Sequence, residues 1–330
     1  MSAAIRPVGI TGIAYAVPPR VLTNHDLERM VDTSDEWIRT RTGIVERHIA
    51  DPEVATSDLA LAAARPALAR AGMRPDELDL VIVATATPDM QFPATACIVQ
   101  DGLGATRAGA FDLQAGCSGF VYGVSLASQA IATGACANAL VVGAEVLSRV
   151  VDWSDRSTCI IAGDGAGAGV LQPVEEGRGV LSGVLRADGS GGDFLKLPAG
   201  GSRMPTTLDT VKQGLHYARM DGNEIFRFAV RVVEEVAVEC LERAGLTIAD
   251  VDLIVPHQAN IRIIEACAQR MGIALQKWVC NIDRYGNTSA ASIPIALAES
   301  VESGRLTQGQ VVLLVGFGAG LTYAATAIRW

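Results

Sequence analysis

Short apolar runs alternate with longer amphipathic or small-residue stretches along almost the whole chain. The runs are continuously apolar, which is typical of strands buried on both faces. The longer stretches predict helices, and two of them end at a glycine. The expected strands are 80–85, 110–113, 140–143, 253–256 and 313–316, and the expected helices are 57–71, 117–131, 225–244 and 290–299. This order predicts an α/β protein with a mainly parallel, helix-covered sheet.

The pattern repeats itself at a fixed spacing. The dipeptides Ala71-Gly72 and Asp79-Leu80 recur 173 residues later, and so does the apolar run 140–143. Two matches at one spacing favour an internal duplication, with chance similarity between two α/β units as the alternative. If the duplication holds, Cys117 corresponds to Ala290, so one half carries a thiol where the other carries a methyl group.

The duplication predicts a division of the chain into two similar halves. We expect an N-terminal half at 1–173 and a C-terminal half at 174–330. The stretches 23–50 and 186–222 are more polar and richer in turn residues, so they are expected insertions. Such loops on a rigid scaffold are candidate walls of a substrate site.

Composition and charge narrow the class of protein. The chain has 330 residues, of which 49% are hydrophobic and 19% are charged, and its net charge is −9. That charge argues against broad nucleic-acid binding, which needs a basic surface. The uncharged stretches 113–144 and 311–328 are interrupted by glycine, so we interpret them as buried helix and strand rather than membrane spans.

The spacing of the cysteines and the first twelve residues indicate the cellular compartment in which the protein is expected. Seven cysteines are scattered without a Cys-x-x-Cys pair, which disfavours a disulfide framework or a cysteine-rich zinc site and favours a reducing cytosol. Residues 1–12 lack a basic region followed by an apolar core, so no signal peptide is expected.

Cys117 is the first of three chemically able side chains that stand among small residues. It lies in Ala-Gly-Cys-Ser-Gly-Phe (115–120), after an expected strand and at the start of an expected helix. A helix N-terminus would lower the pKa of a thiol and supply N–H groups for an oxyanion. The alternative is a buried apolar cysteine, the commoner fate of this residue type.

His257 and Asn287 are the other two. His257 ends an expected strand in Val-Pro-His-Gln-Ala-Asn (255–260), at the edge where α/β sheets place their sites. Asn287 lies in Tyr-Gly-Asn-Thr-Ser-Ala-Ala-Ser (285–292), just before a helix. A capping or core histidine and a turn asparagine are the alternatives. Together with the thiol, the two side chains are suited to thioester chemistry, which needs a nucleophile and hydrogen-bond partners for a carbonyl oxygen.

Two glycine-rich runs complete the set of motifs. Gly-Phe-Gly-Ala-Gly (316–320) is either a tight turn or a backbone wall around a reacting carbonyl. Gly-Asp-Gly-Ala-Gly-Ala-Gly (163–169) is not followed by the Lys-Ser/Thr of a phosphate-binding loop, so we interpret it as structural.

With these motifs, the chain resembles β-ketoacyl-acyl carrier protein synthase III of the thiolase superfamily. The similarity runs from about Ile10 to Trp330 and includes Asp-Thr-Ser-Asp-Glu-Trp-Ile (32–38) and Arg-Thr-Gly-Ile (41–44). The joint occurrence of these motifs in order is far more specific than any one of them. The resemblance implies the thiolase fold, with two duplicated α/β halves in five α-β-α-β-α layers.

The resemblance also implies a role for each of the three side chains. Cys117 would be the acylated nucleophile, while His257 and Asn287 would bind the thioester carbonyl of a malonyl group and stabilise the enolate formed as CO₂ leaves. The backbone N–H groups of Cys117 and Ala319 would form the oxyanion hole. Elongating enzymes of the superfamily use two histidines, so the asparagine favours the type that starts synthesis.

Binding residues are implied in the same way. The coenzyme A contacts would be Thr33, Trp37, Arg41, Arg156 and Asn223, with Trp37 and Arg156 stacking on the adenine. Phe92 would line the acyl pocket of a partner subunit, which implies a homodimer. The docking site for an acidic acyl carrier protein would use Arg227, Arg231 and Arg262. Core packing of Trp37 and an ordinary solvated face for the three arginines are the alternatives.

The resemblance therefore predicts a cytoplasmic acyltransferase that starts type II fatty acid synthesis. It would use acyl-CoA and malonyl-acyl carrier protein as substrates, without a metal or other cofactor. The sequence departs from the family with Gly-Cys-Ser-Gly where Ala-Cys-Ala-Gly is common, and with Ala319 where some members have Gly. The alternatives are a related enzyme of a secondary-metabolite pathway and a non-catalytic subunit that binds acyl chains or partners.

Overall fold

Two larger β-sheets form the framework of the protein in the computed structural model, which describes residues 6–330. The first sheet has the strand order β1-β7-β6-β4-β5, and the second has the order β11-β12-β13-β8. Two small sheets pair β2 with β3 and β9 with β10. The strands are β1 (Val8–Ala16), β2 (Val21–Thr23), β3 (Glu46–His48), β4 (Leu80–Ala84), β5 (Gly109–Leu113), β6 (Ala139–Val146), β7 (Asp164–Pro173), β8 (Gly179–Ala187), β9 (Leu195–Lys196), β10 (Arg219–Met220), β11 (Leu253–Pro256), β12 (Val311–Gly318) and β13 (Thr322–Arg329).

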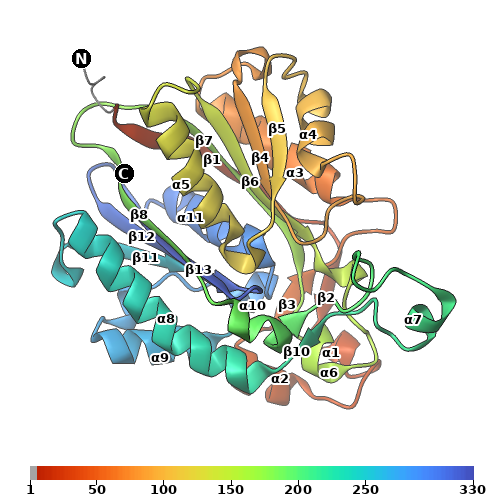
Figure 1. The fold of residues 1–330 in the computed structure, drawn as a ribbon. Helices are drawn as coiled ribbons and strands as arrows, with labels where there is room; N and C mark the ends of the chain where they lie inside the picture. The colour runs from red at the N-terminus through yellow and green to blue at the C-terminus, as the bar shows by residue number, and fades with distance from the viewer. Residues whose placement is uncertain (1–5) are drawn as a thin grey trace.

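Helices separate and cover these sheets, so that the molecule has five layers (Figure 1). Helix α3 packs on the outer face of the first sheet, α5 and α11 lie between the two sheets, and α8 and α9 cover the second. The helices are α1 (Asn24–Leu27), α2 (Asp35–Thr42), α3 (Thr56–Arg70), α4 (Thr95–Leu103), α5 (Gly119–Ala132), α6 (Arg156–Cys159), α7 (Leu208–Lys212), α8 (Gly222–Arg243), α9 (Ile261–Met271), α10 (Ile282–Tyr285) and α11 (Ser292–Glu302). The five-layered thiolase arrangement is confirmed.

The two sheets have the same internal design. In each, two neighbouring strands run parallel (β4 and β6; β11 and β12), the next is antiparallel (β7; β13), and a strand from the start of the half closes the edge (β1; β8). The expectation of mainly parallel sheets was wrong, because antiparallel pairs are at least as common here. A continuous apolar run indicates that a strand is buried on both faces, whatever its direction. Antiparallel β7 is buried in this way, because α3 and α11 pack against it.

The long uncharged stretches are internal elements. Residues 113–144 form α5 and most of β6, and residues 311–328 form β12 and most of β13. Within residues 6–330 no helix has the length and apolarity needed to cross a membrane. The run 163–169 enters β7, a buried strand, so its glycines serve packing. The boundary proposed between 173 and 174 falls between β7 and β8 and stays a prediction.

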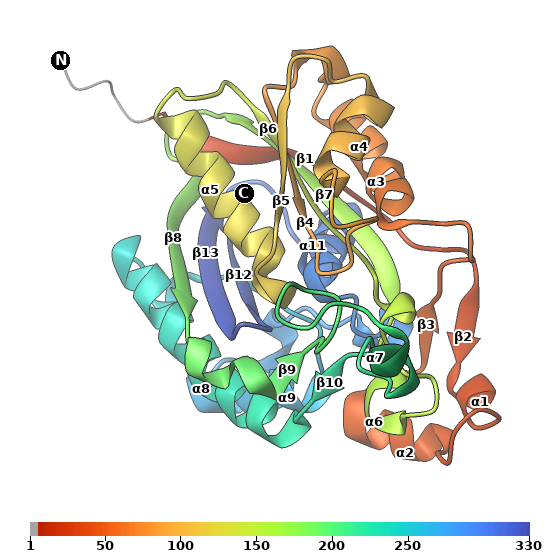
Figure 2. The same ribbon diagram turned by 45° about the vertical axis from the view of Figure 1, so that its right-hand side comes forward.

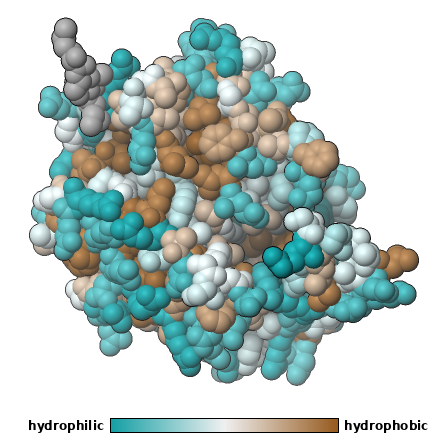
Figure 3. All heavy atoms as spheres, in the orientation of Figure 1, coloured by the Kyte–Doolittle hydropathy of each residue, from teal (hydrophilic) through white to brown (hydrophobic). Residues whose placement is uncertain are grey.

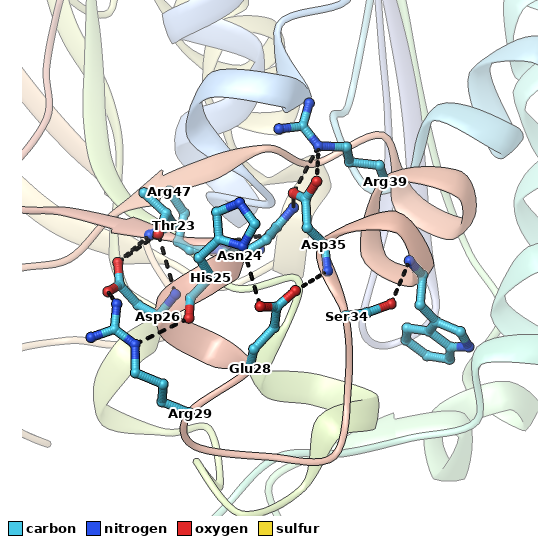
Figure 4. A network of polar contacts seen from close by, with 11 residues as sticks. Thr23, Asn24, His25, Asp26, Glu28, Arg29, Ser34, Asp35, Arg39 and Arg47 are labelled. Atoms are coloured by element: carbon cyan, nitrogen blue, oxygen red, sulfur yellow. Dashed lines mark hydrogen bonds and ion pairs between the residues drawn. The ribbon is translucent and has the colours of Figure 1, made fainter.

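Both polar insertions lie on one side of the layered body (Figure 2). The stretch 23–50 holds α1, α2 and β3, and the stretch 186–222 holds β9, α7 and β10. A polar network fixes the start of α2 (Figure 4). The Asn24 side chain accepts a hydrogen bond from buried Arg47 at 2.9 Å and donates one to Asp35 at 2.9 Å, and Ser34 caps the helix. This network holds α2 against the body.

Candidate active site

Two equivalent turns meet between the halves. A 3₁₀ turn at Gly116–Ser118 leads directly into α5, and a second at Ser289–Ala291 leads directly into α11. The first residues of the turns share a left-handed conformation, with φ of 50° at Gly116 and 48° at Ser289. Cys117 and Ala290 are the central residues of the two turns, as the duplication predicts.

Glycine allows the close approach that builds this junction. A Cβ atom on Gly143 of β6 would lie 2.1 Å from the carbonyl oxygen of Ala290. A Cβ atom on Gly318 would lie 2.4 Å from the amide nitrogen of Cys117. No side chain fits at either position, so β6 packs directly against the 289–291 turn and β12 against the 116–118 turn.

Two cavities meet at Cys117 and Asn287. The larger, about 700 Å³, is also lined by His257 and reaches Trp37 and Arg262 at its outer part. The smaller, about 250 Å³, is mainly apolar. Its lining includes Ala86, Thr87, Leu147, Val150, Ser289 and Ala319. Figure 3 shows a hollow with an apolar floor beside the segment that carries α7. Both insertions contribute walls, as expected from their composition.

Cys117 is a neutral thiol in this setting. Burial raises its pKa from 9.0 to about 12, and the charge of Glu145 acts in the same direction, while a hydrogen bond with Ser289 opposes them. The expected lowering by a helix N-terminus was therefore wrong. The thiol lies in a 3₁₀ turn before α5 rather than in its first helical turn, and desolvation of the thiolate outweighs the favourable contacts.

His257 is a neutral imidazole. It follows β11, its side chain is buried, and this burial lowers its pKa from 6.5 to about 3. Its Nδ1 lies 2.7 Å from the Ser292 hydroxyl, which accepts the Gln258 N–H at 3.4 Å. When the Ser292 hydroxyl donates to Nδ1, the imidazole proton is on Nε2. The edge of Phe317 packs on the ring at a centroid distance of 5.2 Å.

Asn287 is held by its backbone and by its side-chain oxygen. Its N–H donates to Ile161 at 2.7 Å, and its carbonyl accepts the Gly163 N–H at 2.9 Å. Its Oδ1 accepts the Ser289 N–H at 2.8 Å. This contact identifies the oxygen and leaves the amide NH₂ as the group available to the cavities.

The backbone of Ala319 lies against the turn that carries Cys117. Ala319 lies in the loop between β12 and β13, and a Cβ atom on Gly116 would lie 2.6 Å from its amide nitrogen. Within residues 6–330 the Ala319 N–H donates to no backbone carbonyl. Residues 316–320 therefore combine both alternatives, a turn between strands and a wall beside the thiol.

Three of the five residues expected to bind coenzyme A line the larger cavity. Trp37, Arg41 and Asn223 line it. The Arg41 and Arg156 guanidinium carbons lie 4.7 and 5.0 Å from the Trp37 ring centroid. At that distance no ring fits between Arg156 and Trp37, so a stacked adenine would have to displace the arginine. Thr33 is outside the lining, and its hydroxyl is buried without a partner among the described residues.

The remaining predicted residues lie at the surface. Arg262 lines the mouth of the larger cavity, whereas Arg227 and Arg231 pair with Glu224 and Glu235 at 2.6 and 3.6 Å. The groove beside Arg231 is mostly acidic. Arg262 thus suits an acidic partner better than Arg231 does. The Phe92 side chain is outside both cavities.

The sequence interpretation missed Glu145, and it left Ser289 and Ser292 without roles. Glu145 is buried near the end of β6 and contacts Ser289. A single carboxylate in an otherwise apolar strand was a signal that could have identified it. Ser289 and Ser292 belong to the segment 285–292, but their contacts depend on distant residues. No group of three or more potential metal ligands gathers anywhere in residues 6–330.

Comparisons with known proteins agree with this geometry. Residues 111–189 match the family described as 3-oxoacyl-[acyl-carrier-protein (ACP)] synthase III, and residues 241–330 match its C-terminal part. The β-ketoacyl-[acyl-carrier-protein] synthase III of Symbiobacterium thermophilum is 62% identical over 99% of both chains. The crystal structure of the Thermus thermophilus synthase III has a TM-score of 0.91 and 47% identity, covering 98% of this chain and 99% of that one. The priming β-ketosynthase of the R1128 polyketide pathway has a TM-score of 0.91 at 38% identity, covering 98% and 96%.

The duplicated five-layered fold and its relatives define a thiolase-fold condensing enzyme, an acyltransferase. Within that class, the chain belongs to the β-ketoacyl-[acyl-carrier-protein] synthase III family. The enzymes of this family start fatty acid synthesis.

Proposed function

We propose that the chain joins a short acyl-CoA to malonyl-acyl carrier protein by decarboxylative Claisen condensation. The products are β-ketoacyl-acyl carrier protein, coenzyme A and CO₂. The observation that carries this proposal is the meeting of two cavities at one buried thiol, with neutral His257 and the Asn287 amide on the same lining. The reaction uses acyl-CoA as a substrate and needs no resident cofactor.

The first half-reaction transfers the acyl group to Cys117. The thiol is neutral at rest, so its proton leaves as the new S–C bond forms and ends on the sulfur of coenzyme A. The carbonyl oxygen becomes negative in between, and the N–H groups of Cys117 and Ala319 are the donors that stabilise it. The smaller, mainly apolar cavity then holds the acyl chain.

The second half-reaction uses His257 and Asn287. Loss of CO₂ from the malonyl group leaves an electron pair that spreads onto the thioester oxygen. The Nε2–H of His257 and the amide NH₂ of Asn287 donate to that oxygen and stabilise the enolate. A neutral histidine suits this task because its proton stays in place over the working pH range. The enolate carbon then attacks the acyl carbon on Cys117. The C–S bond to Cys117 breaks, and the released thiolate takes up a proton from water to return to the neutral thiol.

Binding is proposed to follow the rim of the larger cavity. Trp37 and Arg156 take the adenine once Arg156 moves off the ring, while Thr33, Arg41 and Asn223 contact the rest of coenzyme A. Arg262, with Arg227 and Arg231, receives the acidic carrier protein. The working unit is a cytoplasmic homodimer in which Phe92 of one subunit lines the acyl pocket of the other.

The test combines a mass measurement with a product assay. Incubation with acetyl-CoA should add one acetyl group to the peptide that contains Cys117. Acetyl-, isobutyryl- and hexanoyl-CoA are then assayed with malonyl-acyl carrier protein. No turnover with any of these primers would reject the assignment to fatty acid priming and favour the secondary-metabolite alternative. The absence of any adduct on Cys117 would favour the non-catalytic subunit.

A further inference from the structure

Glu145 is the centre of a hydrogen-bond network that no step of the proposed reaction uses. Its carboxylate is completely buried and accepts from the hydroxyls of Thr87 at 2.6 Å, Ser289 at 2.9 Å and Thr85 at 3.2 Å, and from the Ala86 N–H at 3.1 Å. These donors come from the segment after β4 and from the turn that begins α11. One side chain of β6 therefore joins both halves beside the thiol.

The hydroxyl protons in this network have defined directions. The Thr87 hydroxyl accepts the Val146 N–H at 2.9 Å, and the Thr85 hydroxyl accepts the Thr87 N–H at 3.0 Å. Each therefore has its proton free for Glu145. Burial raises the pKa of the Glu145 carboxyl, and these four hydrogen bonds act in the opposite direction by stabilising its ionised form.

Ser289 carries a second, independent signal. Its φ of 48° lies in the left-handed region, and it is the only non-glycine residue of 6–330 with a positive φ. Its counterpart in the other half is Gly116, for which that conformation is unstrained. A strained serine where glycine fits the backbone better indicates that the hydroxyl has a task.

We propose that Glu145 and Ser289 are a pair of positioning residues for this condensation site. Glu145 holds the Ser289 hydroxyl, and the Ser289 N–H in turn holds Oδ1 of Asn287, so that the Asn287 NH₂ faces the cavity. The inference rests on the proposed function. It adds that the orientation of the Asn287 donor depends on a carboxylate in the opposite half.

The same pair influences Cys117. The Ser289 hydroxyl donates to the Glu145 carboxylate at 2.9 Å, and Ser289 lines the smaller cavity together with Cys117. The Glu145 charge raises the pKa of the thiol, while the Ser289 hydrogen bond lowers it. Removing one partner should therefore move the Cys117 pKa in the direction opposite to removing the other.

The experiment compares the wild-type chain with Ser289→Gly and Glu145→Gln. Ser289→Gly deletes the hydroxyl, keeps the N–H and copies the unstrained Gly116. Relief of the strain offsets part of the lost hydrogen bond to Glu145, so the variant should fold. CO₂ release from malonyl-acyl carrier protein should fall by about tenfold or more, because misplacing a donor weakens stabilisation of the enolate. The control is Ser300→Ala, at a buried serine whose hydroxyl donates to the Ala296 carbonyl, and it should retain wild-type decarboxylation.

A second readout is the pH dependence of Cys117 alkylation by iodoacetamide, followed by peptide mass spectrometry. At each pH tested, we expect alkylation of Cys117 to be slower than wild type in Ser289→Gly and faster in Glu145→Gln. A purely structural role predicts no such opposite shifts. Wild-type decarboxylation in Ser289→Gly, or shifts that are absent or of the same sign, would overturn the proposal. If Glu145→Gln does not fold, the two Ser289→Gly measurements decide it.

The alkylation measurement needs no substrate. It therefore tests the Glu145–Ser289 pair independently of the proposed function. A wild-type chain that releases no CO₂ would reject the proposed function. Opposite alkylation shifts in the same preparation would still establish the Glu145–Ser289 network.

Discussion

Cys117 and His257 are both electrically neutral because both are buried. The pKa of the thiol is raised to about 12, and that of the imidazole is lowered to about 3. Neither value reflects a strong ion pair between them. The two side chains therefore carry no charge at rest, and negative charge develops on the substrate oxygen only in the transition states, where fixed N–H donors are most effective.

Cys117→Ala should separate the two half-reactions. Acylation by acetyl-CoA should be lost, whereas malonyl decarboxylation should persist because His257 and Asn287 remain. Mass spectrometry and CO₂ release measure the two activities on one preparation. Loss of both in a variant with wild-type thermal stability would contradict this division of labour.

His257→Ala should spare acylation of Cys117 more than condensation. Its donor acts on the malonyl oxygen, so its removal leaves acyl transfer less affected. Single-turnover acetylation and steady-state condensation give the two rates. An equal loss in both would indicate that the imidazole acts mainly on the thiol.

The buried histidine also predicts an acid-dependent loss of stability. In the unfolded chain His257 binds a proton below about pH 6.5, whereas in the folded chain it stays neutral down to about 3. The stabilising contribution of neutral His257 to the free energy of unfolding is fully present above pH 6.5. It is lost as the pH falls toward 3, by up to about 1.4 kcal/mol per pH unit. Denaturant unfolding of wild type and His257→Gln across this range should show the smaller slope in the variant. Equal slopes would contradict it.

At the scale of elements, the positions of helices and strands along the chain were predicted better than the directions in which the strands run. The strand 253–256 and the helix 57–71 match β11 and α3 within one residue, because apolar runs and terminal glycines mark them clearly. Strand direction was not predictable, since burial on both faces gives the same apolar pattern in parallel and antiparallel strands. The pKa of Cys117 was also missed, because the depth of its burial depends on β12 and the 289–291 turn.

Gly143 is the position where β6 packs against the 289–291 turn beside the active site. Gly143→Ala should destabilise the fold by about 2 kcal/mol or more and reduce condensation, because the new methyl group would collide with the Ala290 carbonyl. Gly189→Ala is the control, as a Cβ atom there meets nothing within 4 Å. Thermal unfolding and turnover should distinguish the two. Equal behaviour would show that the 289–291 turn is free to move away.

The whole molecule presents Phe92 to solvent, with 85% of its surface exposed. Met90 and Phe111 nearby in the first half are also exposed, the latter on edge strand β5. Exposed apolar groups of this size usually meet a partner. Phe92→Ala should therefore shift the preference among acetyl-, isobutyryl- and hexanoyl-CoA while leaving acetylation of Cys117 possible. Sedimentation measures the oligomeric state, and a monomeric wild type would contradict a role for Phe92 in a partner's pocket.

The twin turns have a consequence for stoichiometry. Ala290 occupies the place that corresponds to the thiol, but it is completely buried, with its carbonyl against Gly143 and its methyl group near Gly119. A reactive group has neither space nor access there. A duplicated polypeptide has thus kept a single loading point, and exhaustive titration with acyl-CoA should end at one acyl group per chain.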